Sequence, residues 1–335
     1  MTVAVRSFAK INLGLYIGRV RADGFHDLRT VYQTIALHDV IRVTAGRGHG
    51  IEILCQDPRV PLDSSNTCYR MAERVMGEFG AKGKVTVEIE KRLPVQGGLG
   101  AASSNAVATM VGLERALKKS LTGTTKLRVA AEVGSDLPLF LFGGTALGVG
   151  RGEEVYPLPD FEATPLVVVT PEVGVSTPRA FAAWDARTGE GARPHTGDTS
   201  SVQLTQSGGS DRLVEVGRVL SSWLSGLPNT GAPRKGGSRA GSLLLDLVRT
   251  GIENDFEKVV FPQYPELRDI KRALERAGAG YASLSGSGST LYGLFRSRAE
   301  AVKAAGWLRK QGVKAVATST LTRRQYRQKF LVSGC

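Results

Sequence analysis

The stretch Leu93–Ala106 reads LPVQGGLGAASSNA, in which small residues separate a strand-like run from a helix-like one. Before it, residues 85–90 (VTVEIE) alternate in polarity, which is typical of a half-buried strand. After it, apolar residues recur at spacings of four, three and four, so they share one face of a helix: Ala106, Met110, Leu113 and Leu117. The sequence therefore predicts a strand, a small-residue loop and a helix, in that order.

A loop of this composition suits a phosphate. Small side chains let the backbone approach a ligand closely, and the start of a helix offers unpaired N–H groups at the positive end of its dipole. The alternative is a tight turn packed against a sheet, and this segment alone leaves both open. The P-loop pattern G-x-x-x-x-G-K-[ST] is absent, and Ser103 stands where the dinucleotide fingerprint needs its third glycine, so these two motifs are excluded.

The rest of the chain reads as a mixture of strands and helices. Residues 3–43 are strand-like with turn residues at 21–24, which predicts a hairpin or meander. Further strands are expected at 51–55, 144–149, 164–170, 281–285 and 290–295, and helices at 64–79, 265–277 and 297–310. Because the order is mixed rather than a regular βαβ series, the fold class is α+β. The length of 335 residues suits two domains, which we place at 1–158 and 159–335.

Two segments of the second half have an unusual composition. Between Thr188 and Ser242 the chain is rich in Gly, Ser, Thr, Pro and Arg, which predicts a mobile insert around 188–242 with a short helix near 211–224. Residues 321–330 (LTRRQYRQKF) form a basic tail. Such a tail could bind an acidic partner, although solvated surface is its commoner meaning.

Composition limits the class of protein. No apolar run approaches the roughly 20 residues needed to cross a bilayer, and residues 1–18 lack the apolar core of a secretory signal, so we expect a cytoplasmic protein. Cys55, Cys68 and Cys335 form no C-x-x-C pair and fit reduced thiols. The net charge of +13 and the pI of about 9.9 would attract polyanions, from nucleic acids to nucleoside phosphates.

Three further segments carry polar groups in unexpected surroundings. In residues 134–140 (GSDLPLF), Asp136 is a carboxylate in an apolar segment, although capping a helix or turn is a common use of Asp. Residues 284–290 (LSGSGST) form a second small-residue loop between predicted strands, which could be an ordinary hairpin turn. Residues 9–13 (AKINL) place Lys10 and Asn12 in an apolar strand, where an edge strand with one solvent-facing lysine is the simpler explanation.

Taken together and in this order, these segments resemble the signature motifs of the GHMP small-molecule kinases. The resemblance covers nearly the whole chain and includes GFHDL (24–28), GGTALGVGRGEEV (143–155) and NDFE (254–257). It implies an N-terminal domain like domain 2 of ribosomal protein S5, a ferredoxin-like α/β C-terminal domain, and an active site in the cleft between them. It also implies ATP-dependent transfer of a phosphoryl group to an alcohol.

The resemblance assigns the nucleotide to the two small-residue loops. The residues expected to bind ATP are Pro94, Gly97, Gly98, Leu99, Gly100, Ala101, Ala102, Ser103, Ser104, Gly286, Ser287 and Gly288. Ala101 and Ala102 depart from the pattern, since many relatives have glycine there, and should restrict the loop slightly. Mg²⁺ is expected to bind the nucleotide phosphates, with no metal ligands from the protein, because the sequence has no cluster of carboxylates or histidines.

For the chemistry, the resemblance makes Asp136 the acceptor of the substrate hydroxyl proton, with Lys10 beside it. Whether Asp136 acts as a full base or mainly orients the hydroxyl stays open. The substrate implied is a small molecule, a cytidine diphosphate-linked methylerythritol phosphorylated on its 2-hydroxyl, on the non-mevalonate route to isoprenoid precursors. Its expected contacts are Asn12 near the reacting hydroxyl, Thr177 near the phosphates, Phe25 and Phe181 stacked on cytosine, and His26 at the base edge.

Two alternatives remain at this point. Another GHMP kinase, acting on mevalonate, homoserine or a sugar, would share the loops but has little use for two aromatic rings and His26. A basic nucleic-acid-binding protein would explain the charge of +13 but not Asp136 within GSDLPLF. We expect a monomer or weak homodimer, with no nucleic acid or membrane among its partners.

Overall fold

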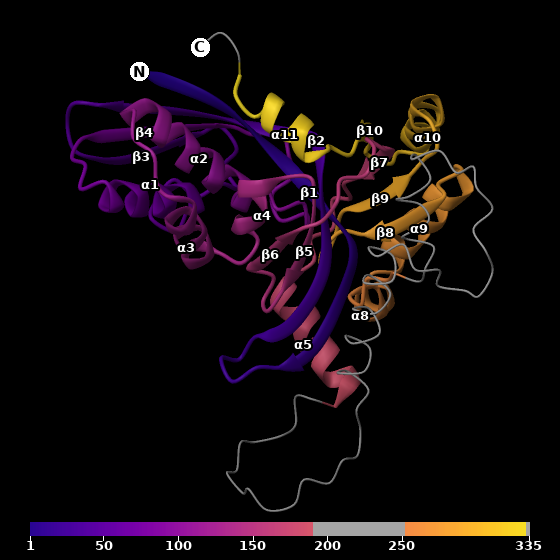
Figure 1. Cartoon of the computed structure of the whole chain (residues 1–335). Helices are drawn as coiled ribbons and strands as arrows, with labels where there is room; N and C mark the ends of the chain where they lie inside the picture. Colours follow the sequence, from indigo (N-terminus) through magenta and orange to yellow (C-terminus); the bar gives the residue numbers. More distant parts are fainter. Residues whose placement is uncertain (190–251, 333–335) are drawn as a thin grey trace, which may run out of the picture.

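The computed structural model describes residues 1–189 and 252–332, which form two β-sheets joined by a long hairpin (Figure 1). The hairpin consists of β1 (Thr2–Val20) and β2 (His26–Gly46), which are antiparallel over nearly their whole length. At its tip the N–H of Arg21 donates to the carbonyl oxygen of Phe25, and Gly24 has a φ of +80°. The hairpin and the turn predicted at 21–24 are therefore confirmed.

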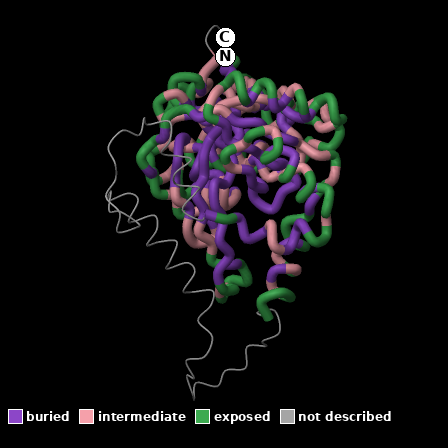
Figure 2. Tube along the Cα trace, turned by 90° about the vertical axis from the view of Figure 1, so that its right-hand side faces the viewer, coloured by how far each residue is buried: buried purple, intermediate pink, exposed green. Residues whose placement is uncertain are grey.

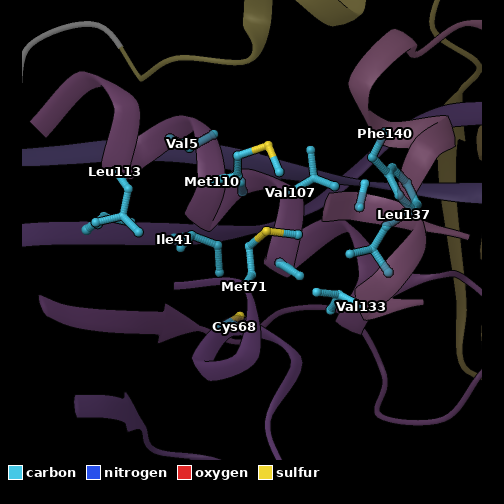
Figure 3. Close-up of a cluster of buried hydrophobic side chains, with 14 of the residues drawn as sticks. Val5, Ile41, Cys68, Met71, Val107, Met110, Leu113, Val133, Leu137 and Phe140 are labelled. Atoms are coloured by element: carbon cyan, nitrogen blue, oxygen red, sulfur yellow. The ribbon is translucent and has the colours of Figure 1, made fainter. Parts of the chain in front are cut away.

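The first sheet is built around β2. Its order is β3-β4-β2-β5-β6, with β1 also paired to β2, and the further strands are β3 (Gly50–Cys55), β4 (Lys84–Glu90), β5 (Thr145–Val149) and β6 (Glu154–Pro157). The helices that pack with it are α1 (Thr67–Glu78), α2 (Ala101–Leu117), α3 (Gly123–Val133) and α4 (Leu137–Phe142). Helix α2 lies very close to β2, because a Cβ at Gly112 would meet the Val43 side chain at 2.5 Å. Figure 3 shows the buried side chains between these helices and the sheet.

The second sheet is fully antiparallel. Its order is β10-β7-β9-β8, comprising β10 (Ala315–Ser319), β7 (Pro165–Val169), β9 (Leu291–Leu294) and β8 (Tyr281–Leu284). Its core is shared with the helices α5 (Thr177–Thr188), α8 (Glu257–Gln263), α9 (Pro265–Arg276) and α10 (Arg298–Lys310).

A third cluster of buried side chains joins the two sheets. It contains Ile11 and Leu13 from β1 together with Leu166 and Tyr292 from β7 and β9. The Tyr292 hydroxyl also donates to the backbone oxygen of Asn12 at 2.8 Å. Figure 2 shows the buried residues as one continuous interior. The middle of β1 therefore belongs to the junction between the two halves.

The C-terminal segment differs from the basic tail expected from the sequence. Residues Arg323–Lys329 form helix α11, which begins with a capping box between Thr322 and Gln325. Tyr326 is 2% exposed, and its hydroxyl donates to the Phe140 backbone oxygen at 2.7 Å. The sequence did not indicate this buried face, because most of the neighbouring residues are basic. The domain limits 1–158 and 159–335 stay a prediction, but α11 packs with the first sheet rather than the second.

Most of the expected elements are present. The predicted helices at 64–79, 265–277 and 297–310 correspond to α1, α9 and α10. Residues 315–319 and 137–142 form β10 and α4, which were not predicted because both are too short to show a period. The insert around 188–242 and its helix near 211–224 fall on residues 190–251, which lie outside the described residues, as does Cys335. Cys55 and Cys68 are free thiols.

Among the helices of residues 1–189 and 252–332, none has the length and apolar composition needed to cross a membrane.

Candidate active site

The two small-residue loops lie against each other. Gly98 and Gly100 have φ values of +75° and +67°, which favour glycine. A Cβ at Gly98 would overlap the carbonyl oxygen of Ser285. The Ser285 hydroxyl donates to the Gly98 oxygen at 2.9 Å, and the Thr290 N–H donates to the Gly97 oxygen at 3.2 Å. Loop 97–100 and loop 285–290 therefore form one surface, although 187 residues separate Gly98 from Ser285.

The first loop ends at the start of helix α2. Gly100 is the N-cap, and no side chain caps the helix, so the first N–H groups of α2 remain free of side-chain partners at its positive end. The hydroxyl of Ser104 is buried in the first turn and has no hydrogen-bond partner within the described part of the chain. Ala101 and Ala102 are the first two residues of α2, where alanine is favourable, and the restriction expected relative to glycine stays a prediction. This arrangement suits an anion.

Lys10 and Asp136 meet directly in front of this helix start. The Lys10 Nζ lies 3.4 Å from Asp136 Oδ2 and 2.7 Å from Asn12 Oδ1. Only 5% of the Lys10 side chain is exposed, against 32% of the Asp136 side chain. The Lys10 N–H donates to the Leu99 oxygen, and a Cβ at Gly100 would lie 3.0 Å from Lys10 Cγ. The structure thus brings Lys10, Asn12 and Asp136 together beside the loop.

Tyr32 also belongs to this group, and sequence reasoning missed it. Its hydroxyl donates to Asp136 Oδ1 at 2.9 Å, and its ring centroid is 5.5 Å from Lys10 Nζ. Burial, and then the negative charge of Asp136, raise the pKa of Tyr32 well above its usual value, so the hydroxyl keeps its proton. Cβ atoms at Gly148 and Gly152 would lie 2.5 and 2.6 Å from the Tyr32 side chain. Two glycines of GVGRGEE therefore make room for Tyr32.

Helix α5 leads from the second loop toward the hairpin tip (Figure 1). At its start the Thr177 hydroxyl lies 2.7 Å from the Ser287 hydroxyl. One turn later the Phe181 ring stacks on His26, with 4.8 Å between centroids and 12° between planes. His26 is the first residue of β2. The predicted substrate residues Thr177 and Phe181 therefore lie on α5, and His26 of β2 packs against Phe181.

Phe25 and Phe181 contact different side chains. Its ring is 53% exposed at the hairpin tip and lies 5.0 Å from the guanidinium of Arg151. The Phe181 ring contacts the Phe256 ring edge-on at 5.0 Å, in addition to His26. An aromatic clamp formed by Phe25 and Phe181 stays a prediction.

Two buried polar side chains hold the loops in place, and neither was named as a site residue from the sequence. Asp39 is 0% exposed and accepts hydrogen bonds from Lys91 Nζ and the Leu93 N–H, both at 2.7 Å, at the entrance of the first loop. Asn254 donates to the backbone oxygens of Leu284 and Gly286 at 2.9 and 2.8 Å. The NDFE segment thus supports the second loop.

A hollow of about 860 Å³ lies between the end of β4 and the segment that follows β3. It is lined by residues 54–59 and 88–91 together with Arg42 and Leu62. Across residues 1–189 and 252–332, no group of three His, Cys, Asp or Glu side chains is placed to hold a metal ion.

Comparisons with known proteins agree with this geometry. Residues 66–144 match the family model described as "GHMP kinases N terminal domain", and residues 239–314 match "GHMP kinases C terminal". A mevalonate kinase structure superposes with a TM-score of 0.65 over 96% of this chain and 99% of that chain. At 12% identity this match shows the fold alone. The fold is that of the GHMP kinases, as the sequence predicted.

More similar relatives narrow the class. A 4-diphosphocytidyl-2-C-methyl-D-erythritol kinase from Solibacter usitatus is 37% identical over 88% of this chain and 81% of the relative. One from Geobacter sulfurreducens is 32% identical over 95% and 99%, respectively. A crystal structure of 4-(cytidine 5'-diphospho)-2C-methyl-D-erythritol kinase has a TM-score of 0.67 at 27% identity, covering 95% of this chain and 98% of that one. The chain belongs to the family of 4-diphosphocytidyl-2-C-methyl-D-erythritol kinases.

Proposed function

We propose that this protein uses ATP to phosphorylate the 2-hydroxyl of 4-diphosphocytidyl-2-C-methyl-D-erythritol, giving the 2-phosphate and ADP. The product continues on the non-mevalonate route to isoprenoid precursors. The observation that carries the proposal is the Lys10–Asp136 pair, 3.4 Å apart, in front of an uncapped helix start. Family membership supports the choice of substrate over mevalonate or homoserine.

The nucleotide phosphates fit the first loop and the start of α2. Free N–H groups and the positive end of the helix dipole stabilise an anion there. The partnerless hydroxyl of Ser104 supplies a further polar contact in the same turn. Mg²⁺ bound to the phosphate oxygens would neutralise part of their charge. The hollow of about 860 Å³ at the end of β4 offers space for the purine base.

The phosphoryl transfer depends on the two oxygens of Asp136. Oδ1 accepts a hydrogen bond from Tyr32, and Oδ2 faces Lys10 and remains able to accept the proton of a substrate hydroxyl. As that proton moves to Asp136, the hydroxyl oxygen bonds to the terminal phosphorus of ATP, the bond from this phosphorus to the bridging oxygen breaks, and ADP leaves. The Lys10 ammonium lies 3.4 Å from the carboxylate and stabilises the charge that develops on the reacting oxygens.

The substrate would extend along α5 to the hairpin tip. In this placement Asn12 lies beside the reacting hydroxyl and Thr177 beside the diphosphate. Phe181 and Phe25 stack on the cytosine, and His26 contacts its edge. The contact of Thr177 with Ser287 and of Phe181 with His26 supports one continuous site from the loops to the tip.

The Asp136→Asn variant tests the chemistry. The amide keeps the size of the side chain and can still accept from Tyr32, but it cannot take up a proton. We expect turnover to fall by about 10²–10⁴-fold, measured as ADP release with the cytidylyl substrate, while ATP affinity stays near the wild-type value. Asp269→Asn, at a carboxylate whose side chain is 71% exposed on α9, serves as the matched control. The proposal would be overturned if Asp136→Asn kept the wild-type rate. It would also be overturned if the wild-type protein preferred mevalonate or homoserine as its substrate.

Phe181→Ala tests the substrate end. Loss of a stacked ring should raise the KM for the cytidylyl substrate by about 5–150-fold, corresponding to roughly 1–3 kcal/mol of stacking. The KM for ATP serves as the internal control and should change little. An unchanged KM for the cytidylyl substrate would contradict stacking on Phe181.

A further inference from the structure

We propose that Asp185 fixes the proton of His26 on Nε2, so that Nδ1 is a hydrogen-bond acceptor that selects cytosine over uracil. The inference rests on the proposed function, because it gives the His26 ring a substrate base to recognise. Asp185 is a positioning residue, since it acts on the base through His26.

The contact between the two side chains sets the tautomer. Asp185 Oδ1 lies 2.7 Å from His26 Nε2, with 7% of the His26 side chain and 23% of the Asp185 side chain exposed. A carboxylate only accepts hydrogen bonds, so the proton of this bond belongs to Nε2. Nδ1 has no hydrogen-bond partner among residues 1–189 and 252–332. In a neutral imidazole Nδ1 is therefore a free acceptor.

Helix α5 holds the His26 ring from two directions. Phe181 and Asp185 are four residues apart on α5 and share one helix face. Phe181 covers the face of the imidazole, and Asp185 binds its edge. Because the rings of Phe181 and His26 are only 12° from parallel, a base stacked on the same face of Phe181 lies nearly coplanar with the imidazole. Nδ1 then addresses the edge of the base.

Cytosine and uracil differ at the group that such an acceptor meets. Cytosine carries an N4 amino group, which donates, whereas uracil carries an O4 oxygen, which only accepts. An acceptor at Nδ1 pairs with the amino group and repels the oxygen, and the polar groups left unpaired add to the cost. Fixing the His26 proton therefore favours a cytidine substrate over a uridine one.

The test compares wild type, Asp185→Ala and Asp185→Asn with the cytidylyl substrate and its uridylyl analogue. In Asp185→Ala the proton can move to Nδ1, so the ratio of kcat/KM values for the two substrates should fall about tenfold. The kcat at saturating cytidylyl substrate and the KM for ATP should stay unchanged. Asp185→Asn should retain most of the preference, because its amide oxygen still accepts from Nε2.

Asp27→Ala is the matched control. Asp27 adjoins His26 in the chain, its side chain is 52% exposed, and its partner is Arg21 rather than the imidazole. Removing this charge should leave the preference for cytidine as in wild type. A general effect of lost negative charge would lower the preference in Asp27→Ala as well, and would overturn the proposal.

Binding without turnover separates this inference from the proposed function. Cytidine and uridine 5'-diphosphates are titrated calorimetrically into each variant saturated with a non-hydrolysable ATP analogue. A lower affinity for cytidine diphosphate, with the uridine form unaffected, supports the role of Asp185 even if the wild type lacks turnover. An Asp185→Ala variant that keeps the wild-type preference overturns it, and so does an equal loss of affinity for both nucleotides, because a merely structural contact would not distinguish the bases.

Discussion

Tyr32 sets the direction of the carboxylate that faces the reacting hydroxyl. Its hydrogen bond to Oδ1 of Asp136 leaves Oδ2 for Lys10 and for the substrate. Because burial and the neighbouring carboxylate raise the Tyr32 pKa well above its usual value, the donor persists across the neutral pH range. The Tyr32 hydroxyl therefore orients the Asp136 carboxylate.

Tyr32→Phe removes only the hydroxyl. We expect kcat to fall by about 10–150-fold, because a hydrogen bond to a charged group is worth about 1.5–3 kcal/mol, while both KM values change little. Steady-state kinetics separates the effect on kcat from the effect on the two KM values. Tyr281→Phe is the control, since its hydroxyl donates to the backbone oxygens of Leu13 and Ile252 rather than to Asp136. Equal loss of kcat in both variants would contradict an orienting role for Tyr32.

Cys68 gives a second prediction at this scale. Burial raises the pKa of its thiol to about 12, against the opposing hydrogen bond of Thr109. A thiol reacts as the thiolate, and a raised pKa leaves almost none of it at pH 8. Iodoacetamide should therefore label Cys68 far more slowly in the native protein than in denaturant, as read by peptide mass spectrometry. Equally fast labelling in both states would contradict the assignment.

Residues differ in how far the sequence reveals them. Lys10, Asn12 and Asp136 stand in short segments whose composition is unusual, and the structure brings all three together. Tyr32 and Asp185 have no such segment, because the partners they contact lie 104 and 159 residues away. Contacts of that kind depend on strand register and helix placement, which no local pattern contains.

Among elements, loops require their glycines for two separate reasons. Gly98 needs a positive φ of +75° and also a missing Cβ, since Ser285 of the second loop presses against it. A local pattern indicates the first need, but the second arises only when both halves have folded. The loop and helix α2 were predictable from the local pattern, whereas the proximity of loop 285–290 was expected only from the resemblance to the GHMP kinases.

Gly98→Ala should push the two loops apart. Backbone strain of about 1–3 kcal/mol is expected at this position, together with a clash against Ser285. We expect a lower Tm and weaker binding of an ATP analogue by calorimetry. Gly123→Ala, at the start of α3 with nothing near its Cβ position, is the control and should leave both values at least as high as in wild type. Normal ATP affinity in Gly98→Ala would contradict the role of this contact.

Two segments connect the halves of the molecule through the first sheet, the N-terminal hairpin and the C-terminal helix α11. Hairpin β1–β2 contributes to the sheet and to the junction cluster, and α11 brings Tyr326 onto Phe8 and Phe140. The α+β class was predictable from strand and helix patterns. The return of the C-terminal segment was not, because two buried aromatic residues among four basic ones look like solvated charge.

Tyr326→Ala should therefore weaken the fold as a whole. Loss of a fully buried ring lowers the free energy of unfolding by about 3–5 kcal/mol, and the described halves should unfold in one transition because they share a core. Urea titration followed by circular dichroism measures both. Val302→Ala, 51% exposed on α10, is expected to change the free energy by less than about 0.5 kcal/mol. A separate early transition in Tyr326→Ala would show that the halves are independent.

Hairpin β1–β2 is long enough to keep the proposed catalytic lysine and the proposed substrate-binding tip far apart. Lys10 stands midway along β1, among the loops that the GHMP class shares, while the tip at 21–25 and helix α5 approach each other at the far end. A protein engineer seeking a catalyst for a different alcohol could graft a new tip and a new end of α5, provided that Thr177 keeps its contact with Ser287 of the second loop.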